Sequence, residues 1–218
     1  IKIDYRLDLN YPRGKGKNGS LNELTAVSLS AQVLSKLKER NNLDTTKIED
    51  VIWGNVTQVG EQGGCLARSA VLAANYSEST PGLSINRFCA SGLEAVNLAS
   101  NQVKGLAGSA YVAGGVEMMS RVPMGSDGAA IAVDPNLALN THFVPQGISA
   151  DLMATKYGFS RVDVDAYAVE SQKRAKNAWE NQRFHKSIVK ISDQNELTIL
   201  DEDEYMRPQT TMQSLGGL

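Results

Sequence analysis

The chain has 218 residues, 42% of them hydrophobic, enough for one large domain or two small ones with a substantial core. It carries 22 Lys and Arg against 24 Asp and Glu, so the near-neutral charge gives no support to bulk nucleic-acid binding. No apolar run approaches the length of a membrane span, and two cysteines are too few for a disulfide scaffold. A reducing compartment is therefore predicted.

The first part of the chain alternates predicted helices and strands. Apolar residues at helical spacing predict an amphipathic helix over 21–39, with Ser20 and Glu23 forming a capping box. The same reading predicts strands over 51–59, 82–88 and 110–114, and helices over 65–75 and 91–104. This alternation is typical of a parallel α/β sheet with right-handed crossovers.

The pattern changes after Met119. Residues 120–143 contain Gly, Pro, Asp and Asn with little periodicity and are predicted to form a loop. Beyond them we predict a helix over 148–157, a helix over 161–182 capped by Ser160, and short strands over 188–192 and 197–200. The acidic run 201–204 is interpreted as a solvated face.

Several common ligand-binding patterns are absent. Residues 14–20 are rich in Gly and Lys, but their spacing fails the Walker pattern, and the dinucleotide fingerprint is missing. His142 and His185 are isolated and are interpreted as surface or loop histidines. No metal site is therefore predicted.

Cys89 lies where a predicted strand feeds a predicted helix. A thiol at a helix N-terminus meets unpaired N–H groups and the positive end of the helix dipole, and both stabilise a thiolate. The thiolate is the nucleophilic form, so Cys89 is predicted to act in covalent catalysis; the alternative is an inert core cysteine. Cys65 is predicted to be a small core residue, and a disulfide with Cys89 is an alternative that would silence the nucleophile.

The residues around Cys89 carry a family resemblance. The run Asn86-Arg87-Phe88-Cys89-Ala90-Ser91-Gly92-Leu93 closely resembles the nucleophile motif of the thiolases, CoA-dependent enzymes that cleave or form the carbon–carbon bond of 3-ketoacyl-CoA. Four further segments resemble thiolase motifs in the right order: 12–15, where Asn10-Tyr11 replaces the usual Arg-Thr, 60–64, 113–120 and 206–211. Pro145-Gln146 stands where the acetoacetyl-specific type carries His-Met, which favours a broader 3-ketoacyl thiolase.

The resemblance implies an α/β fold with the layered αβαβα architecture of thiolases, of which this chain would be the N-terminal half with an inserted loop domain. The expected domains are an N-terminal α/β domain over 1–119 and an incomplete, CoA-covering loop domain over 120–218. The C-terminal thiolase domain is expected to be absent from the chain.

The implied activity is reversible thiolytic cleavage of 3-ketoacyl-CoA, or Claisen condensation of two acetyl-CoA, through an acyl group on Cys89, as part of fatty acid metabolism. CoA and acyl-CoA are the expected substrates, with no permanently bound cofactor. Arg207 is expected to bind CoA near its adenine nucleotide; the alternative is that it pairs with Asp203 or Glu204. The catalytic base and second acid/base, a His and a Cys in thiolases, are expected in the missing half, so the 218-residue piece alone is expected to be inactive.

The resemblance also implies a homodimer or homotetramer. The expected location is cytoplasmic, or mitochondrial or peroxisomal in a eukaryote. Two other functions stay open: a truncated thiolase-like module that binds CoA or lipid without activity, and a ketoacyl synthase. The cysteine segment of a ketoacyl synthase usually reads Thr-Ala-Cys, unlike Arg87-Phe88-Cys89.

Overall fold

The computed structural model describes residues 9–218, which form two compact units. The first unit comprises the described residues up to Asp127 together with Ser187–Glu204. The second comprises Gly128–Lys186 and Tyr205–Leu218. The division at residue 119 that the thiolase resemblance implies remains a prediction about the domains of the complete protein.

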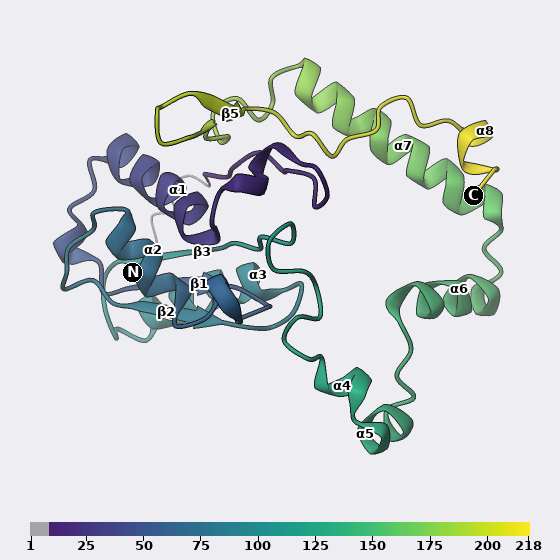
Figure 1. Cartoon of the computed structure of the whole chain (residues 1–218), viewed down its shortest axis with the longest axis horizontal. Coiled ribbons are helices and arrows are strands. Elements are labelled where there is room, and N and C mark those ends of the chain that lie inside the picture. Colours follow the sequence, from purple (N-terminus) through teal and green to yellow (C-terminus); the bar gives the residue numbers. More distant parts are fainter. Residues whose placement is uncertain (1–8) are drawn as a thin grey trace. The chain divides into compact units, whose positions relative to one another are not determined.

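The first unit is built on a three-stranded parallel sheet in the order β2-β1-β3 (Figure 1). Its strands are β1 (Asp50–Gly54), β2 (Gly82–Ile85) and β3 (Tyr111–Gly115). Val51 of the central strand lies opposite Gly82 on one side and Val112 on the other. The parallel α/β sheet predicted from the alternating pattern is therefore confirmed.

Two strands end earlier than predicted, because polar side chains take over their backbone groups. β1 ends at Gly54 instead of residue 59, since the N–H groups of Val56 and Thr57 donate to the Glu117 carboxylate. β2 ends at Ile85 instead of residue 88, where the Asn86 side chain begins a turn. β3 extends to Gly115, one residue beyond the prediction.

Two helices, α1 (Ala26–Asn41) and α2 (Leu66–Ala73), cover one face of this sheet. Val51 and Trp53 of β1 pack into a shared core with apolar residues of both helices. The indole N–H of Trp53 donates to Ser30 Oγ at 3.1 Å, so the buried polar atom of the ring is satisfied. Short 3-10 turns, η2 (Thr45–Lys47) and η3 (Gly60–Gln62), connect these elements.

Helix α1 begins later than the predicted capping box. Thr25 is its N-cap, with Thr25 Oγ1 accepting from Ser28 N–H at 3.1 Å, and Ser20–Glu23 instead form a separate 3-10 turn, η1. The Ser20 hydroxyl instead donates to the Glu204 carboxylate at 2.9 Å, which holds Ser20 in the separate turn. The prediction that Ser20 caps this helix was therefore wrong.

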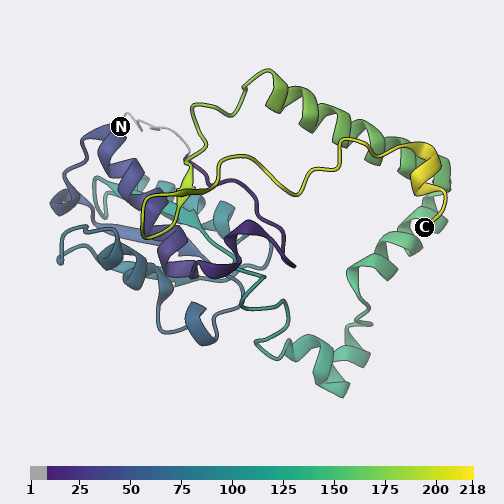
Figure 2. The same cartoon turned by 45° about the horizontal axis from the view of Figure 1, so that its top comes forward.

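A short antiparallel hairpin of β4 (Ile191–Ser192) and β5 (Thr198–Leu200) lies beside α1 (Figure 2). The Gln32 amide joins the two, because Nε2 donates to Ser192 O at 2.9 Å and Oε1 accepts from Ser192 N–H at 3.0 Å. The strands are shorter than predicted but lie within the predicted segments. The chain then leads into Asp203 and Glu204, whose carboxylates accept backbone N–H groups of Arg13, Lys15 and Ser20, so these two acidic residues do not form a simple solvated face.

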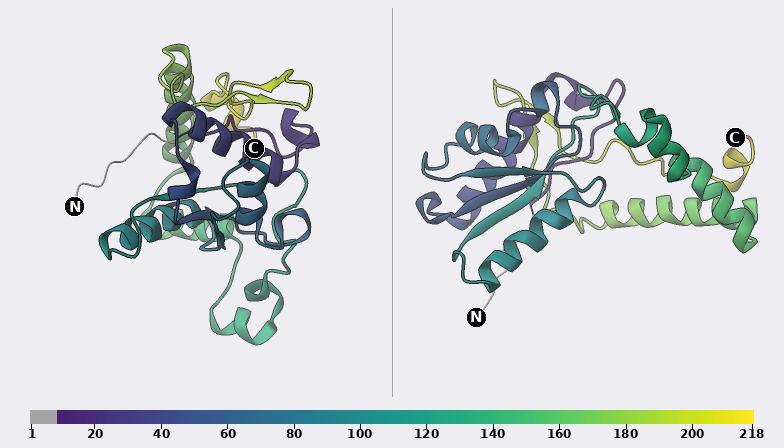
Figure 3. Two further views of the ribbon diagram at one scale, coloured as in Figure 1. Left: turned by 90° about the vertical axis from the view of Figure 1, so that its left-hand side faces the viewer. Right: turned by 90° about the horizontal axis from the view of Figure 1, so that it is seen from below.

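Helix α3 (Ser91–Lys104) packs against β1 and β3 on the other face of the sheet (Figure 3). Its bounds agree with the prediction. The approach is close at Gly54, where an added Cβ would lie 2.6 Å from the Ser91 carbonyl carbon and 2.7 Å from Gly92 N. Glycine at position 54 therefore allows the N-terminus of α3 to rest on the end of the central strand.

The second unit is helical. Its elements are α4 (Ala130–Val133), α5 (Pro135–Asn140), α6 (Gln146–Tyr157), α7 (Arg161–Glu180) and α8 (Met212–Leu215). The predicted loop over 120–143 therefore contains two short helices, the second started by an Asp134 cap and a proline in its first turn. Ser160 caps α7 in a capping box with Asp163, as predicted. None of the helices in the described residues is long and apolar enough to span a bilayer.

Candidate active site around Cys89

Cys89 lies on the turn between β2 and α3, one residue before the N-cap Ala90. Its side chain is exposed and its thiol is free. The alternative of a buried core cysteine therefore fails, and the predicted position at a strand-to-helix junction is confirmed.

Side chains of the turn hold its backbone in an unusual conformation. Phe88 has φ of 47°, in the left-handed region that bulky residues rarely adopt. Asn86 Oδ1 accepts the Phe88 N–H at 2.8 Å. Ser91 Oγ accepts the Arg87 N–H at 2.8 Å and donates to Phe88 O at 2.6 Å. Two side chains thus fix the residue before Cys89, and strain of this kind persists only where the surroundings determine it.

The surroundings of Cys89 favour negative charge. No side chain caps the N-terminus of α3 in the described residues, so the positive end of its dipole stays open toward Cys89. Among the described residues, the Cys89 N–H has no hydrogen-bond acceptor. Arg87 and Glu94 form an ion pair at 3.2 Å beside the turn, so their charges offset each other. The turn can therefore support an oxyanion at the Cys89 N–H.

A carboxylate organises the loops behind this turn, at the carboxyl end of the sheet. Glu117, just after β3, accepts Val56 N–H at 2.8 Å, Thr57 N–H at 3.2 Å and Gln62 Nε2 at 2.9 Å. All three donors are neutral. The carboxylate therefore fixes the loop after β1 by charge-assisted hydrogen bonds.

Asn55 links the ends of the three strands. It is almost fully buried; its N–H donates to Ile85 O in the last residue of β2, and its Nδ2 donates to Val116 O just after β3, each at 2.9 Å. Asn55 Oδ1 has no hydrogen-bond partner among residues 9–218. Asn55 thus ties the end of the central strand β1 to both of its neighbours, of which β2 leads into the Cys89 turn.

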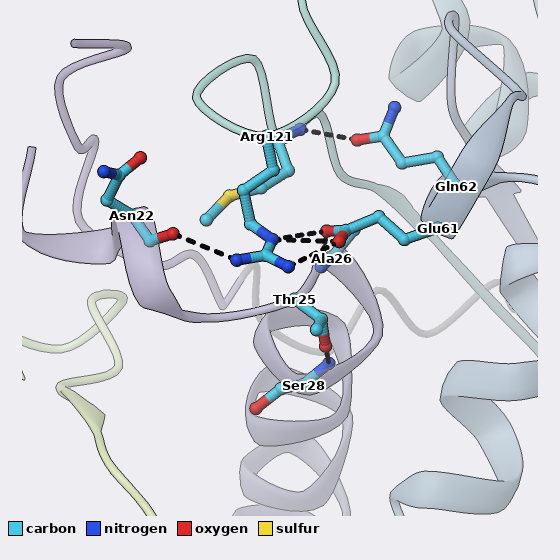
Figure 4. Close-up of polar contacts among 8 residues, drawn as sticks. Asn22, Thr25, Ala26, Ser28, Glu61, Gln62 and Arg121 are labelled. Atoms are coloured by element: carbon cyan, nitrogen blue, oxygen red, sulfur yellow. Dashed lines mark hydrogen bonds and ion pairs between the residues drawn. The ribbon is translucent and has the colours of Figure 1, made fainter.

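An ion pair continues this network toward α1 (Figure 4). Arg121 Nε donates to both carboxylate oxygens of Glu61 at 2.9 Å, and Arg121 Nη1 donates to Asn22 O at 3.3 Å. Nearby, Gln62 Oε1 accepts the Met118 N–H at 2.7 Å. Arg121 and Gln62 therefore secure the chain after β3 to the η3 turn.

Cys65 differs from its prediction as a core residue. It is exposed, has φ of 60° and precedes α2 as its N-cap, with Sγ 3.2 Å from Gly82 O. Both cysteines are free, so the alternative disulfide is not formed. The spacing of the apolar residues placed Cys65 at the start of a helix, but it did not show that the Cys65 side chain is exposed.

Arg207 is exposed in the second unit. Its N–H donates to Gln172 Oε1 at 2.8 Å, and its guanidinium carbon lies 6.0 Å from the centre of the Tyr205 ring. The carboxylates of Asp203 and Glu204, which the alternative reading assigned to Arg207, accept hydrogen bonds inside the first unit. No group of three or more potential metal ligands occurs in the described residues.

Residues 10–218 match the family described as "Thiolase, N-terminal domain". The chain belongs to the thiolase family. It is 37% identical over 216 residues to the 3-ketoacyl-CoA thiolase of Marinomonas sp. (strain MWYL1), covering 95% of this chain and 54% of that protein. The 3-ketoacyl-CoA thiolase of Shewanella sp. (strain MR-7) is 38% identical over 213 residues, with the same coverage. That of Saccharophagus degradans is 34% identical over 227 residues, covering 100% of this chain and 56% of the relative.

This thiolase chain therefore spans about half the length of the curated relatives it matches. The predicted family and its α/β fold class are confirmed. Sequence reasoning missed the roles of Glu117, Asn55 and Asn86. Their positions were the available signal, because Asn55 and Asn86 directly follow β1 and β2 and Glu117 lies two residues beyond β3. Polar side chains gather at the carboxyl ends of parallel strands.

Proposed function

We propose that this chain supplies the nucleophile of a 3-ketoacyl-CoA thiolase, with Cys89 carrying the acyl group. The observation that supports this most is the exposed Cys89 on a strained turn, before the uncapped N-terminus of α3 and with its own N–H unpaired within the described residues. The printed names of the relatives agree with the proposal, since they are 3-ketoacyl-CoA thiolases.

In the cleavage direction, the Cys89 thiolate attacks the 3-keto carbon, and the bond between carbons 2 and 3 breaks. The electron pair leaves with acetyl-CoA as its enolate, which is then protonated. The thiolate of a second CoA attacks the acyl thioester, the bond to Sγ breaks, and an acyl-CoA shorter than the substrate by the two carbons of the acetyl group forms, with Cys89 regenerated. The Cys89 N–H would stabilise the oxyanion of each tetrahedral species on Sγ.

The remaining parts of the proposal concern CoA and proton transfer. Arg207 would contact the adenine nucleotide of CoA, because its guanidinium is exposed and suited to phosphate. The segment 120–218 would cover the CoA molecule. The base for the Cys89 thiol and the second acid/base would come from outside these 218 residues. No permanently bound cofactor is part of this scheme.

Acylation of Cys89 tests the proposal directly. Incubating the complete natural polypeptide with acetyl-CoA should add one acetyl group, and peptide mass spectrometry should locate it on Cys89. Cys89→Ser should lower thiolysis by at least about 1,000-fold, because the nucleophile is lost. Cys65→Ser is the matched control and should retain both acetylation and thiolysis. Acetylation on Cys65 alone would contradict the proposal.

Partners and location complete the proposed picture. The complete protein would form a homodimer or homotetramer and work in the cytoplasm, or in mitochondria or peroxisomes of a eukaryote. The mass of the natural polypeptide separates an enzyme of about twice this length from a binding module of about this length. The family match over residues 10–218, which includes Arg87-Phe88-Cys89, favours a thiolase over a ketoacyl synthase.

A further inference from the structure

Asn86 connects the loop after β1 with the turn that carries Cys89. No other side chain in the described residues connects these two segments directly. Its Nδ2 donates to Val56 O at 3.1 Å, and its Oδ1 accepts the Phe88 N–H at 2.8 Å. Val56 belongs to the loop after β1 that the Glu117 carboxylate holds through the Val56 N–H at 2.8 Å. One amide therefore connects a loop fixed by a charge with the strained residue that precedes the nucleophile.

This connection has a consequence for the Cys89 N–H. The peptide between Phe88 and Cys89 takes its orientation from the backbone of Phe88, whose φ is 47°. In that orientation the Cys89 N–H meets no acceptor among the described residues and stays open. If the Phe88 N–H lost its acceptor, the left-handed conformation would lose a restraint, and the turn could relax toward the more stable region of negative φ.

We propose that Asn86 is a positioning residue for the oxyanion site of Cys89, anchored by Glu117, and this inference rests on the proposed function. Asn86 does not touch the reacting atoms. It sets the peptide that presents the Cys89 N–H to the thioester oxygen, while Ser91 holds the other side of the turn through the Arg87 N–H and Phe88 O. Its effect should therefore fall on steps that build an oxyanion, and not on the nucleophilicity of sulfur.

Two reactions of the same thiol separate these effects. In acetylation by acetyl-CoA, sulfur attacks the thioester carbonyl and a tetrahedral oxyanion forms. CoA then leaves as a thiolate, which takes up the proton released from the Cys89 thiol. In alkylation by iodoacetamide, sulfur displaces iodide and no oxyanion forms. A residue that positions the oxyanion donor should affect the first rate and spare the second.

The experiment uses the complete natural polypeptide and its Asn86→Ala variant. Loss of one oxyanion donor costs about 100- to 1,000-fold, so misplacing it should slow acetylation of Cys89 about 10- to 100-fold. The rate of alkylation by iodoacetamide should change less than about twofold, and the apparent Michaelis constant for CoA should stay the same. Asn195→Ala is the matched control, because Asn195 is exposed in the hairpin turn and its side chain makes no hydrogen bond in the described structure.

A second variant tests the anchor. Glu117→Gln keeps the shape of the side chain but places an amide against the N–H donors of Val56 and Thr57, so it should slow acetylation in the same direction. Because Glu117 acts through Asn86, the double variant should be no slower than Asn86→Ala alone within about twofold. Additive losses would show that Glu117 acts by another route.

The outcomes are distinguishable. A wild-type protein that is not acetylated on Cys89 contradicts the proposed function itself. A wild type that is acetylated, with Asn86→Ala equally fast, overturns the positioning role alone. Equal losses in acetylation and alkylation also overturn it, because they would indicate general disorder of the turn. If Asn86→Ala fails to fold, Asn86→Asp retains the acceptor for the Phe88 N–H, loses the donor to Val56 O and adds a charge that acts on the sulfur in both reactions; its acetylation must then fall relative to its alkylation.

Discussion

At the scale of single residues, Glu204 shows how one carboxylate orders a glycine-rich loop. It accepts the N–H groups of Lys15 and Ser20 at 2.8 Å and the Ser20 hydroxyl at 2.9 Å. Partial burial acts to raise the pKa of Glu204, but these hydrogen bonds and the charge of Lys15 outweigh it and lower the pKa below its usual value. A lowered pKa in the folded state means that the ionised form contributes stability above the unfolded-state pKa. That contribution is lost as the pH falls through the folded-state value.

Glu204→Gln should therefore loosen residues 13–20 at neutral pH. Hydrogen bonds to a charged group are worth about 1.5–3 kcal/mol, so amide hydrogen exchange at Lys15 and Ser20 should become about 10- to 100-fold faster than in the wild type. Lowering the pH through the folded-state pKa of Glu204, which protonates the wild-type carboxylate, should narrow this difference. Glu202→Gln, at an exposed position in the same acidic run, should leave exchange unchanged at either pH. A difference that persists undiminished at low pH would argue against the charge.

At the scale of elements, the contact between β1 and α3 places the nucleophile. Gly54 ends the central strand and lies against the backbone of Ser91 and Gly92, two and three residues beyond Cys89. Backbone atoms cannot move aside as a flexible side chain can. The separation of strand and helix at this point therefore depends on the missing Cβ.

Gly54→Ala should push the N-terminus of α3 away from the sheet. Its Cβ would stand 2.6 Å from the Ser91 carbonyl carbon, and overpacking of this kind costs about 1–3 kcal/mol. We expect a lower melting temperature together with a fall in the rate of Cys89 acetylation of about tenfold or more. Gly16→Ala is the control, since an added Cβ at Gly16 meets nothing within 4 Å. An unchanged acetylation rate in Gly54→Ala would mean that α3 can shift without moving the turn.

Most helices and strands of the first unit were predictable from the sequence, and the boundaries that were predicted wrongly share a cause. Periodicity located α3 to the residue and placed β1, β2 and β3 in order, because buried faces leave a regular apolar pattern. It failed at the ends of β1 and β2 and at the start of α1, where Glu117, Asn86 and Glu204 capture backbone groups from elsewhere in the chain. Contacts between residues as distant as Ser20 and Glu204 leave no local pattern.

The candidate site was likewise predictable only where it depends on a local sequence motif. Cys89 could be named from its local motif, whereas the network behind it depends on strand ends that only the fold brings together. Glu117 and Asn86 are separated by 31 positions, yet they meet on either side of Val56. Single side chains that satisfy backbone groups at a distance are therefore the part of a site least accessible from sequence.

At the scale of the whole molecule, the α3 side of the sheet exposes apolar side chains. Leu83 is opposite Ile52 in the register and so shares the face of the sheet that α3 covers. Leu83 is 44% exposed, and Leu93 and Val96 of α3 are 65% and 43% exposed. Exposed apolar groups gathered on one side of a sheet are typical of surfaces that another chain or domain covers. We expect the complete protein to cover this side, through its remaining half or a second copy.

Leu93→Glu tests this expectation with opposite results in two proteins. In the 218-residue chain expressed alone, which should aggregate and lack thiolysis, the charge should increase the soluble fraction in sedimentation velocity. In the complete protein, which we propose to be a dimer or tetramer, the same charge should be buried and should lower the melting temperature or dissociate the assembly. Leu72→Glu is the matched control, because Leu72 is 46% exposed on α2, over the other face. A monodisperse 218-residue monomer with measurable thiolysis would refute both the covered face and the assignment of the base to another part of the protein, because such a piece would need neither.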